Sequence, residues 1–223
     1  EYAALSAAQG YAQLTGRAAA VFVHVDVGTQ NMGGAVHNAF RCRVPVYIFA
    51  GISPFTMENE LAGGRNAQIQ FLQDVRDQAG IVRSYTKMNF ELSSGKNVQQ
   101  MVFRALQLAL SEPKGPVYTM ASREILEEEG RDIKADLSLW PPVAPGGLDG
   151  DSPELVIDAL LGAEKPLIVT SYLGRNTQSV GELVKISERL AIPVVEMNQY
   201  TMNFPGDNSM HLGFDSHSLI KEA

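Results

Sequence analysis

Short runs of apolar, β-branched residues alternate with longer stretches of helical periodicity, and this alternation is the strongest restriction on the fold. The runs AAVFVHV (19–25) and VPVYIFA (44–50) are predicted to be buried strands. Between them lie DVGTQN (26–31), predicted to be a loop, and a Gly- and Ala-rich helical stretch that ends near Phe40. Because this order requires a crossover connection, the sequence predicts an α/β fold with a parallel sheet flanked by helices.

The remaining elements of the first part follow from periodicity and from turn residues. We expect a helix over 1–17 that ends at Gly16, and a loop over 51–68. Within 69–90 we expect a short helix and then extended chain (81–90). A helix should follow from Lys96 to about Ser111, and a third strand should lie within PKGPVYTMA (113–121).

Changes in composition divide the chain into three parts. Residues 1–122 are predicted to form one α/β domain. Residues 123–152 are charged and then rich in Pro and Gly, which predicts a linker. Residues 153–223 repeat the βα pattern, with a helix from Ser152, strands in KPLIVTS and IPVVEMN, and a helix over 176–190. So little sheet predicts only part of a second domain.

Charge and composition exclude several classes of protein. With 18 Lys and Arg against 25 Asp and Glu, the net charge is −7, which argues against a nucleic-acid-binding surface. The single cysteine, Cys42, allows no internal disulfide and fits a reducing compartment. No apolar run approaches the roughly 20 residues that span a bilayer. We therefore expect an intracellular protein, cytoplasmic or mitochondrial, that binds neither membrane nor nucleic acid.

Familiar catalytic motifs are absent from the sequence. There is no G-x-G-x-x-G after a predicted strand, no phosphate-binding P-loop and no G-x-S-x-G. The four histidines, at 24, 37, 211 and 217, lack the spacing of metal ligands, and no metal site is predicted.

Two features remain as candidates for a site. Glu1 heads an apolar helix, where an acid is commonly placed by the helix dipole alone. DVGTQN follows a buried strand, at the edge of the sheet where α/β proteins bind ligands. The alternative for this segment is a plain connection in which Thr29 or Asn31 caps the next helix. The residues alone favour neither interpretation.

Read together, these segments resemble one known family. The run E-x-A-A-x-x-A-A-x-G-Y-A-x-x-T-G-R, an apolar strand, G-T-Q-N and V-P-V-Y-I-F-A-G-x-x-P resemble the pyrimidine-binding domain of thiamine-diphosphate-dependent enzymes of the acetolactate synthase large-subunit type. Y-T-K (85–87) and K-G-P-V-Y (114–118) are also similar to that family, and KPLIVTS and LAIPVVE resemble the start of its central domain.

The resemblance implies a set of site residues. Glu1 takes the place of the family's catalytic glutamate, which bonds the aminopyrimidine ring and so promotes proton removal at the thiazolium. Gly28 and Asn31 take the places of loop residues near the cofactor, and His24 replaces a Thr. The expected cofactor-binding residues are therefore Glu1, His24, Gly28 and Asn31.

This sequence departs from the family's pattern at several positions. Asp26-Val27 replaces a Gly-Pro, Ile52 replaces a Gln, and the run from Gly28 to Ala39 is closer to the benzoylformate decarboxylase branch. Two other functions therefore stay open: a nonoxidative 2-oxo acid decarboxylase or acyl-CoA lyase, and a non-catalytic interaction or regulatory module. GRN (64–66) and the arginines at 41 and 43 could meet an anionic substrate, although solvated loop charges are commoner.

The resemblance also implies partners that this sequence does not itself provide. In the family, the diphosphate and Mg²⁺ are held by a separate domain with a G-D-G motif and a later Asn, for which Gly206-Asp207-Asn208 is the only near match. We expect a fragment that is inactive alone, from a parent that uses thiamine diphosphate, Mg²⁺ and a 2-oxo acid. The parent is expected to be a homodimer or tetramer, and the resemblance leaves FAD in the central domain open.

Overall fold

The computed structural model describes residues 1–130, 134, 136–214 and 216–223. The chain divides into two compact units, Glu1–Pro145 and Gly146–Ala223. Each unit has its own parallel sheet, with four strands in the first and two in the second. The units are described separately.

The sheet of the first unit has the strand order β1-β2-β4-β3, and all three pairings are parallel. Its strands are β1 (Ala19–Val23), β2 (Val46–Ile52), β4 (Val117–Ser122) and β3 (Asn89–Glu91). The chain passes from β2 to β3 and then returns to place β4 between them. Because all strands run the same way, their carboxyl ends meet at one edge of the sheet.

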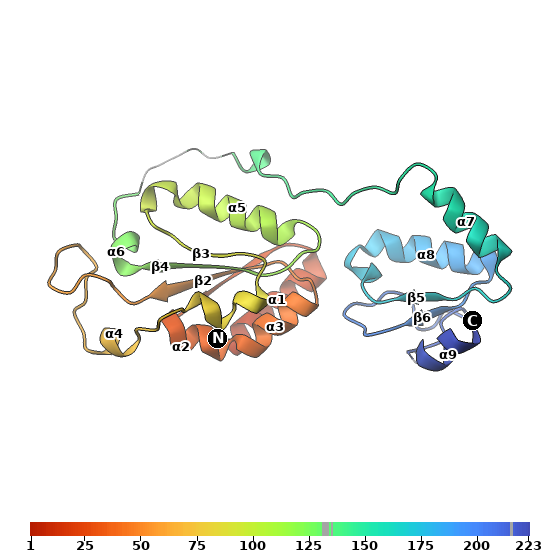
Figure 1. Ribbon diagram of the computed structural model, residues 1–223, viewed down its shortest axis with the longest axis horizontal. Helices are drawn as coiled ribbons and strands as arrows, with labels where there is room; N and C mark the ends of the chain where they lie inside the picture. Colours follow the sequence, from red (N-terminus) through yellow and green to blue (C-terminus); the bar gives the residue numbers. More distant parts are fainter. Residues whose placement is uncertain (131–133, 135, 215) are drawn as a thin grey trace. The chain divides into compact units, whose positions relative to one another are not determined.

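Helices cover both faces of this sheet. Figure 1 shows α1 (Tyr2–Thr15), α2 (Val25–Asn31) and α3 (Gly33–Arg41) on one face and α5 (Val98–Leu110) on the other. The face beneath α1 and α3 carries the larger buried cluster, which includes Leu5, Met32, Val36, Val46, Ile48 and Tyr118. The face beneath α5 buries Tyr47, Ala105, Ala109 and Val117. The predicted parallel α/β layer is confirmed.

Several predicted elements agree with the structure. Helix α1 ends at Gly16, whose φ of 69° is the left-handed conformation that glycine adopts without a Cβ clash. The predicted helix from Lys96 is the short 3₁₀ helix η3 (Gly95–Asn97) followed by α5. The predicted third strand is β4.

Two predictions for the first unit are wrong. DVGTQN is not a loop, because Val25–Asn31 forms helix α2. The stretch 81–90 is mostly not extended: η1 (Ala79–Ile81) and η2 (Arg83–Tyr85) are 3₁₀ helices, and only β3 at its end is a strand. A helix of seven residues or a strand of three contains no more than about two repeats of its hydrophobic pattern, so periodicity in the sequence does not reveal it.

The long connection after β2 is held in place by a buried acid. The connection contains one short α-helix, α4 (Ile69–Leu72), ahead of η1 and η2. Glu124, in α6 (Arg123–Leu126), is 5% exposed, and its Oε1 accepts bonds from Phe55 N at 2.9 Å, Thr56 N at 2.8 Å and Thr56 Oγ1 at 2.7 Å. Gly63, at a φ of 85°, lies so close to α6 that a Cβ would come within 2.7 Å of the Arg123 carbonyl. The connection is therefore anchored at the carboxyl end of β4.

The second unit contains a smaller parallel sheet. Strands β5 (Ile168–Thr170) and β6 (Val194–Glu196) pair directly, and the helices are α7 (Ser152–Gly162), α8 (Thr177–Leu190) and α9 (Ser216–Glu222). The short 3₁₀ helix η5 (Leu173–Arg175) lies between β5 and α8, whereas η4 (Leu137–Leu139) belongs to the first unit. Residues 131–133 and 135 of the predicted linker lie outside the described residues.

Candidate functional site

Three of the four predicted site residues lie together. Asn31, the last residue of α2, donates from Nδ2 to Oε2 of Glu1 at 2.6 Å. Glu1 immediately precedes α1, and its side chain makes no capping bond to that helix. The Glu1 carboxylate is thus directed at α2 and does not cap its own helix.

Gly28 forms the floor beneath this carboxylate. A Cβ at residue 28 would lie 3.4 Å from Glu1 Oε1 and 3.3 Å from the Cβ of Val23. The contact with Val23 would be tighter than ordinary packing and the contact with Oε1 an ordinary van der Waals contact, so any side chain at residue 28 would occupy the space next to Oε1. That oxygen has no partner among the described residues, whereas Oε2 is held by Asn31.

His24 lies at the same end of β1 and contacts a different neighbour. It is the N-cap residue of α2, its carbonyl accepts a bond from Gly28 N at 2.7 Å, and its exposed ring places Nε2 3.2 Å from the amide nitrogen of Gln73. The Gln73 amide can donate to an unprotonated ring nitrogen there. Among the described residues, the polar partner of the His24 ring is Gln73 and not Glu1.

The corner between β1 and α2 is strained. Val25 has a φ of 32°, a conformation that is rare and costly for a β-branched residue. Its side chain is 6% exposed, so packing keeps it in place. The neighbouring carboxylate of Asp26 is 5% exposed, and its Oδ1 has no hydrogen-bond partner among the described residues. The corner is therefore buried at Val25 and Asp26, whereas Val27 is 58% exposed.

A buried chain of hydrogen bonds ties α2 to the sheet. The hydroxyls of Thr29 and Tyr118 lie 2.8 Å apart, and Gln78 Nε2 donates to the Tyr118 hydroxyl at 2.9 Å and to the Gly51 carbonyl at 2.8 Å. Thr29 also donates to the Val25 carbonyl at 2.7 Å. Neither Thr29 nor Asn31 caps α3, whose N-cap is Met32, so that expected alternative is wrong.

Burial determines whether the Tyr118 hydroxyl, at the centre of these hydrogen bonds, keeps its proton. It raises the pKa of Tyr118 above its usual value, the bonds to Thr29 and Gln78 lower it, and the charge of Asp26 raises it again. The net shift is upward, so Tyr118 stays neutral and keeps a proton to donate. The chain of bonds is therefore a structural connection at ordinary pH.

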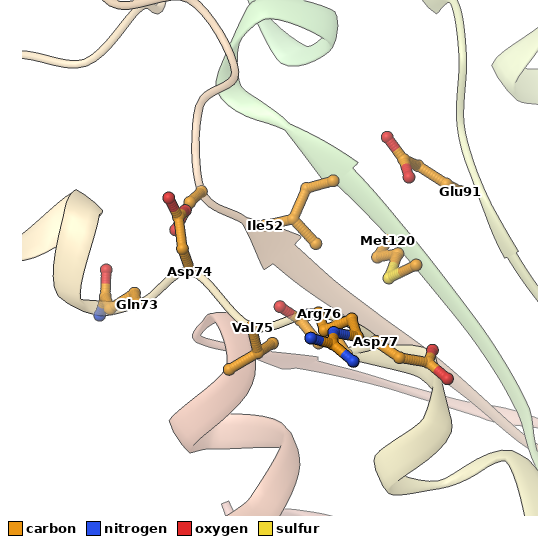
Figure 2. Close-up of a pocket in the computed structure, with 10 residues that line it drawn as sticks. Ile52, Gln73, Asp74, Val75, Arg76, Asp77, Glu91 and Met120 are labelled. Atoms are coloured by element: carbon orange, nitrogen blue, oxygen red, sulfur yellow. The ribbon is translucent and has the colours of Figure 1, made fainter.

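A cavity of about 350 Å³ opens at the carboxyl edge of the sheet. Ile52, Met120 and Glu91 come from the ends of β2, β4 and β3, and Figure 2 shows the segment from Gln73 to Asp77 beside them. The volume is in the range of small-molecule sites, roughly 300–1,000 Å³. The full lining is Ile52, Ser53, Gln73, Asp74, Val75, Arg76, Asp77, Gln78, Glu91 and Met120.

Two of the carboxylates in this cavity are already paired. Asp74 Oδ2 lies 2.7 Å from Arg65 Nη1, and Asp77 accepts two bonds from Arg83, at 2.8 and 2.7 Å. The bond from Arg83 is the main cause that lowers the pKa of Asp77. The Arg65 side chain is only 7% exposed, so the expectation of a solvated loop charge in GRN is wrong for that residue.

Gln78, Tyr118 and the polar cavity residues were not predicted as site residues. Most of them lie in the aperiodic stretch between β2 and β3, where the sequence carries no regular pattern. The one available signal was Tyr118, which lies in the K-G-P-V-Y run.

The second unit contains its own buried polar cluster. Glu196, at the end of β6, accepts from Asn203 Nδ2 at 2.8 Å and lies 3.2 Å from His211 Nε2, in the wall of a cavity of about 390 Å³. The G-D-N sequence at 206–208 is a turn, in which Asn208 donates to Glu188 at 2.8 Å and accepts from Met210 N at 2.9 Å. The Asn208 amide is therefore occupied by the turn itself.

Two further kinds of feature are absent from the residues that the structure describes. In that part of the chain, no three His, Cys, Asp or Glu side chains gather as a metal site. None of the described helices is both long and apolar enough to cross a membrane.

The sequence and the fold are similar to those of known proteins. Residues 1–81 match the family described as "Thiamine pyrophosphate enzyme, N-terminal TPP binding domain". The acetolactate synthase large subunit of Corynebacterium glutamicum is 26% identical over 221 residues, covering 96% of this chain and 33% of the relative. The acetolactate synthase large subunit of Lactococcus lactis is also 26% identical, over 217 residues, which cover 96% of this chain and 36% of the relative. The chain spans about a third of the length of these relatives.

One solved structure has the same fold over most of the chain. It is the thiamine diphosphate-dependent 4-hydroxybenzoylformate decarboxylase of Rhodococcus jostii, with a TM-score of 0.77 at 24% identity, covering 94% of this chain and 38% of that one. The two relatives and this structure come from bacteria and give no support to a mitochondrial location.

Proposed function

We propose, from the match of residues 1–81 to the N-terminal TPP binding domain of thiamine pyrophosphate enzymes, that this chain binds the pyrimidine end of thiamine diphosphate in a larger enzyme resembling acetolactate synthase. The parent reaction is the decarboxylation of a 2-oxo acid such as pyruvate, followed by carboligation to a second carbonyl. Residues 1–122 are the pyrimidine-binding domain, 123–152 the linker, and 153–223 part of the central domain.

The observation that carries this proposal is the bond between Asn31 and Glu1. Because Asn31 Nδ2 can only donate, it occupies Oε2 of Glu1 and leaves Oε1 as the oxygen that faces a ligand. A carboxylic acid with its proton at Oε1 can bond a ring nitrogen. When bound, thiamine diphosphate supplies the electron sink for the carbanion that decarboxylation generates.

The space next to Glu1 supports the same assignment. Gly28 leaves open the volume that a Cβ would take, 3.4 Å from Oε1, and this is where a flat ring can approach the carboxyl group. His24, at the end of β1, is exposed toward the same edge of the sheet and is proposed as a further contact of the cofactor. Glu1 is the catalytic residue of this proposal, and Asn31 positions it.

The diphosphate and Mg²⁺ are assigned to a domain that this chain does not contain. The turn at 206–208 uses its own Asn side chain, which supports this assignment. We further propose that the parent is a homodimer or a tetramer in which a second subunit completes the site. FAD remains a prediction of the resemblance, and the absorbance spectrum of the purified parent tests it.

A titration of the ¹⁵N-labelled chain with thiamine, which lacks the diphosphate, tests the pyrimidine site directly. We expect saturable shifts at the amides of Gly28 and Asn31 that do not depend on Mg²⁺. Glu1→Gln should remove them. Glu154→Gln is the matched control, since Glu154 is an exposed acid in the first turn of α7. Shifts that survive in Glu1→Gln would overturn the assignment.

A second titration separates the two ends of the cofactor. We expect thiamine diphosphate with Mg²⁺ to bind this chain no more tightly than thiamine, because the diphosphate and Mg²⁺ are assigned to residues of another domain. Tight, Mg²⁺-dependent binding to the 223-residue chain would show that the diphosphate site lies within it.

Ile52 favours a second candidate function. It lines the cavity with an apolar side chain where the acetolactate synthase pattern has a Gln, as expected for a nonoxidative 2-oxo acid decarboxylase or an acyl-CoA lyase. Product analysis of the parent with pyruvate distinguishes the two candidates. Acetolactate as the product supports the first, and release of a free aldehyde supports the second.

A further inference from the structure

The cavity at the carboxyl edge of the sheet is lined by one exposed arginine that forms no ion pair with the described residues. Its charged lining residues are Asp74, Arg76, Asp77 and Glu91. Both aspartates are paired with arginines that lie outside the lining. Arg76 makes no hydrogen bond or ion pair with any other described residue, although it lies in the sequence between those two aspartates.

Ser53 adds a second unused donor to the same cavity. Its Oγ is buried and has no hydrogen-bond partner among the residues that the structure describes. A buried hydroxyl without a partner costs free energy that a ligand oxygen can recover. The guanidinium and this hydroxyl are the two kinds of donor that a carboxylate accepts.

Glu91 contributes the opposite charge from another wall. It ends β3 and, like Arg76, has no ion-pair partner in the described part of the chain. In Figure 2, Ile52 and Met120 lie between Glu91 and Arg76. A ligand that reaches from Arg76 across these two apolar side chains therefore meets a negative charge at its far end.

We propose that this cavity binds a small organic monocarboxylate, with Arg76 and Ser53 as the donors to its carboxylate and Glu91 as the residue that rejects a second negative charge. The inference rests on the proposed function only for the choice of a 2-oxo acid as the probe. It assigns specificity to three residues that lie outside the cluster of Glu1, Gly28 and Asn31.

The first test is a titration of the ¹⁵N-labelled chain with sodium pyruvate at constant ionic strength. We expect saturable shifts at the Arg76 Nε–H and the Ser53 amide, with pyruvamide, which lacks the charge, giving none. Arg76→Gln should weaken pyruvate binding about tenfold, as expected for the loss of one charge-assisted bond. Because the Arg76 side chain has no described partner, this change should leave the fold intact, and the same spectra verify that.

Arg17→Gln is the matched control, since it removes the same charge from an exposed arginine between α1 and β1, outside the cavity. It should leave pyruvate binding unchanged. Equal weakening by Arg17→Gln and Arg76→Gln would show nonspecific ion binding and overturn the proposal. So would the absence of saturable shifts, or equal shifts with pyruvamide.

The second test addresses the rejection of dianions. We expect 2-oxoglutarate to bind the unmodified chain more weakly than pyruvate, and Glu91→Gln to raise its affinity severalfold without changing that for pyruvate. An unchanged preference in Glu91→Gln would overturn the role of Glu91. Thiamine binding is read at Gly28 and Asn31, so failure of the proposed cofactor site and failure of this inference give different spectra.

Discussion

The hydroxyl of Tyr118 in β4 lies 2.8 Å from the hydroxyl of Thr29 in α2, although 89 residues separate them in the sequence. Thr29 lies between Gly28 and Asn31, and Gln78, the second partner of Tyr118, lines the cavity. The two parts of the candidate site therefore share one buried hydroxyl group.

Tyr118→Phe should destabilise the first unit. The substitution keeps the ring but removes the partner of two buried polar groups, which costs about 1–3 kcal/mol. Urea unfolding measures the change. Tyr11→Phe, at a tyrosine that is 47% exposed, is the control and should alter the free energy of unfolding by much less. Equal effects of the two substitutions would mean that the buried chain of bonds contributes nothing.

Gly10→Ala should stabilise the protein, whereas Gly28→Ala should not. Both glycines lie within helices, but a Cβ at residue 10 meets nothing within 4 Å. Gly10→Ala should therefore stabilise the protein by about 0.5–1 kcal/mol, the usual gain within a helix. In Gly28→Ala the contacts with Val23 and Glu1 should cancel that gain and weaken thiamine binding. Thermal unfolding and the thiamine titration measure the two effects, and a stabilised Gly28→Ala that binds thiamine normally would contradict the geometry.

Glu124 should make stability depend on pH in the acidic range. Burial raises the pKa of this carboxyl, but the bonds from Thr56 outweigh it, so the folded pKa lies below the usual value. The stabilisation is thus complete above the unfolded pKa of about 4.3 and is lost as the pH falls through the folded pKa.

Comparison with Glu124→Gln isolates this contribution. The difference in unfolding free energy between the two proteins should shrink as the pH is lowered from about 6 to about 3, because the unfolded state then binds the proton more readily. Urea unfolding at a series of pH values measures it. A difference that does not change with pH would mean that the carboxyl keeps its ordinary pKa.

Lys87 should contribute to stability through hydrogen bonds at the end of α5. Its Nζ donates to the carbonyls of Leu108 at 2.5 Å and Ser111 at 2.6 Å. Lys87→Met keeps most of the stem and removes both bonds, so we expect a loss of about 1.5–3 kcal/mol in urea unfolding. Lys96→Met, at a side chain that is 71% exposed, is the control and should have little effect.

The sheet could be predicted because each long strand is a continuous apolar run. β2 and β4 are mostly buried, and such strands show in the sequence without any partner being known. β1 also shows as an apolar run, but at the edge of the sheet it buries Val21 and Val23 and leaves Phe22 72% exposed, so its prediction as a buried strand is only partly right. β3 could not be predicted, because its three residues, Asn89–Glu91, are partly exposed and gain their strand conformation from pairing with β4.

The candidate site could be predicted only in part, for a related reason. A resemblance selected Glu1, Gly28 and Asn31, and their proximity arises from the folding of α2, which the sequence indicated as a loop. Helix α2 contains Gly and Asn, which disfavour helices, and is held by the tertiary bond from Thr29 to Tyr118. The cavity residues lie on irregular chain, where position depends on packing and not on a repeat.

The backbone of Val25 has a further consequence. At a φ of 32° this residue is bent against its own preference, and only the surrounding core prevents it from relaxing. Substitutions that loosen the core near β1 should therefore release α2 before the sheet itself melts. Asn31 would then leave Glu1 while most of the protein is still folded, so ligand binding would fail at a lower temperature than global unfolding.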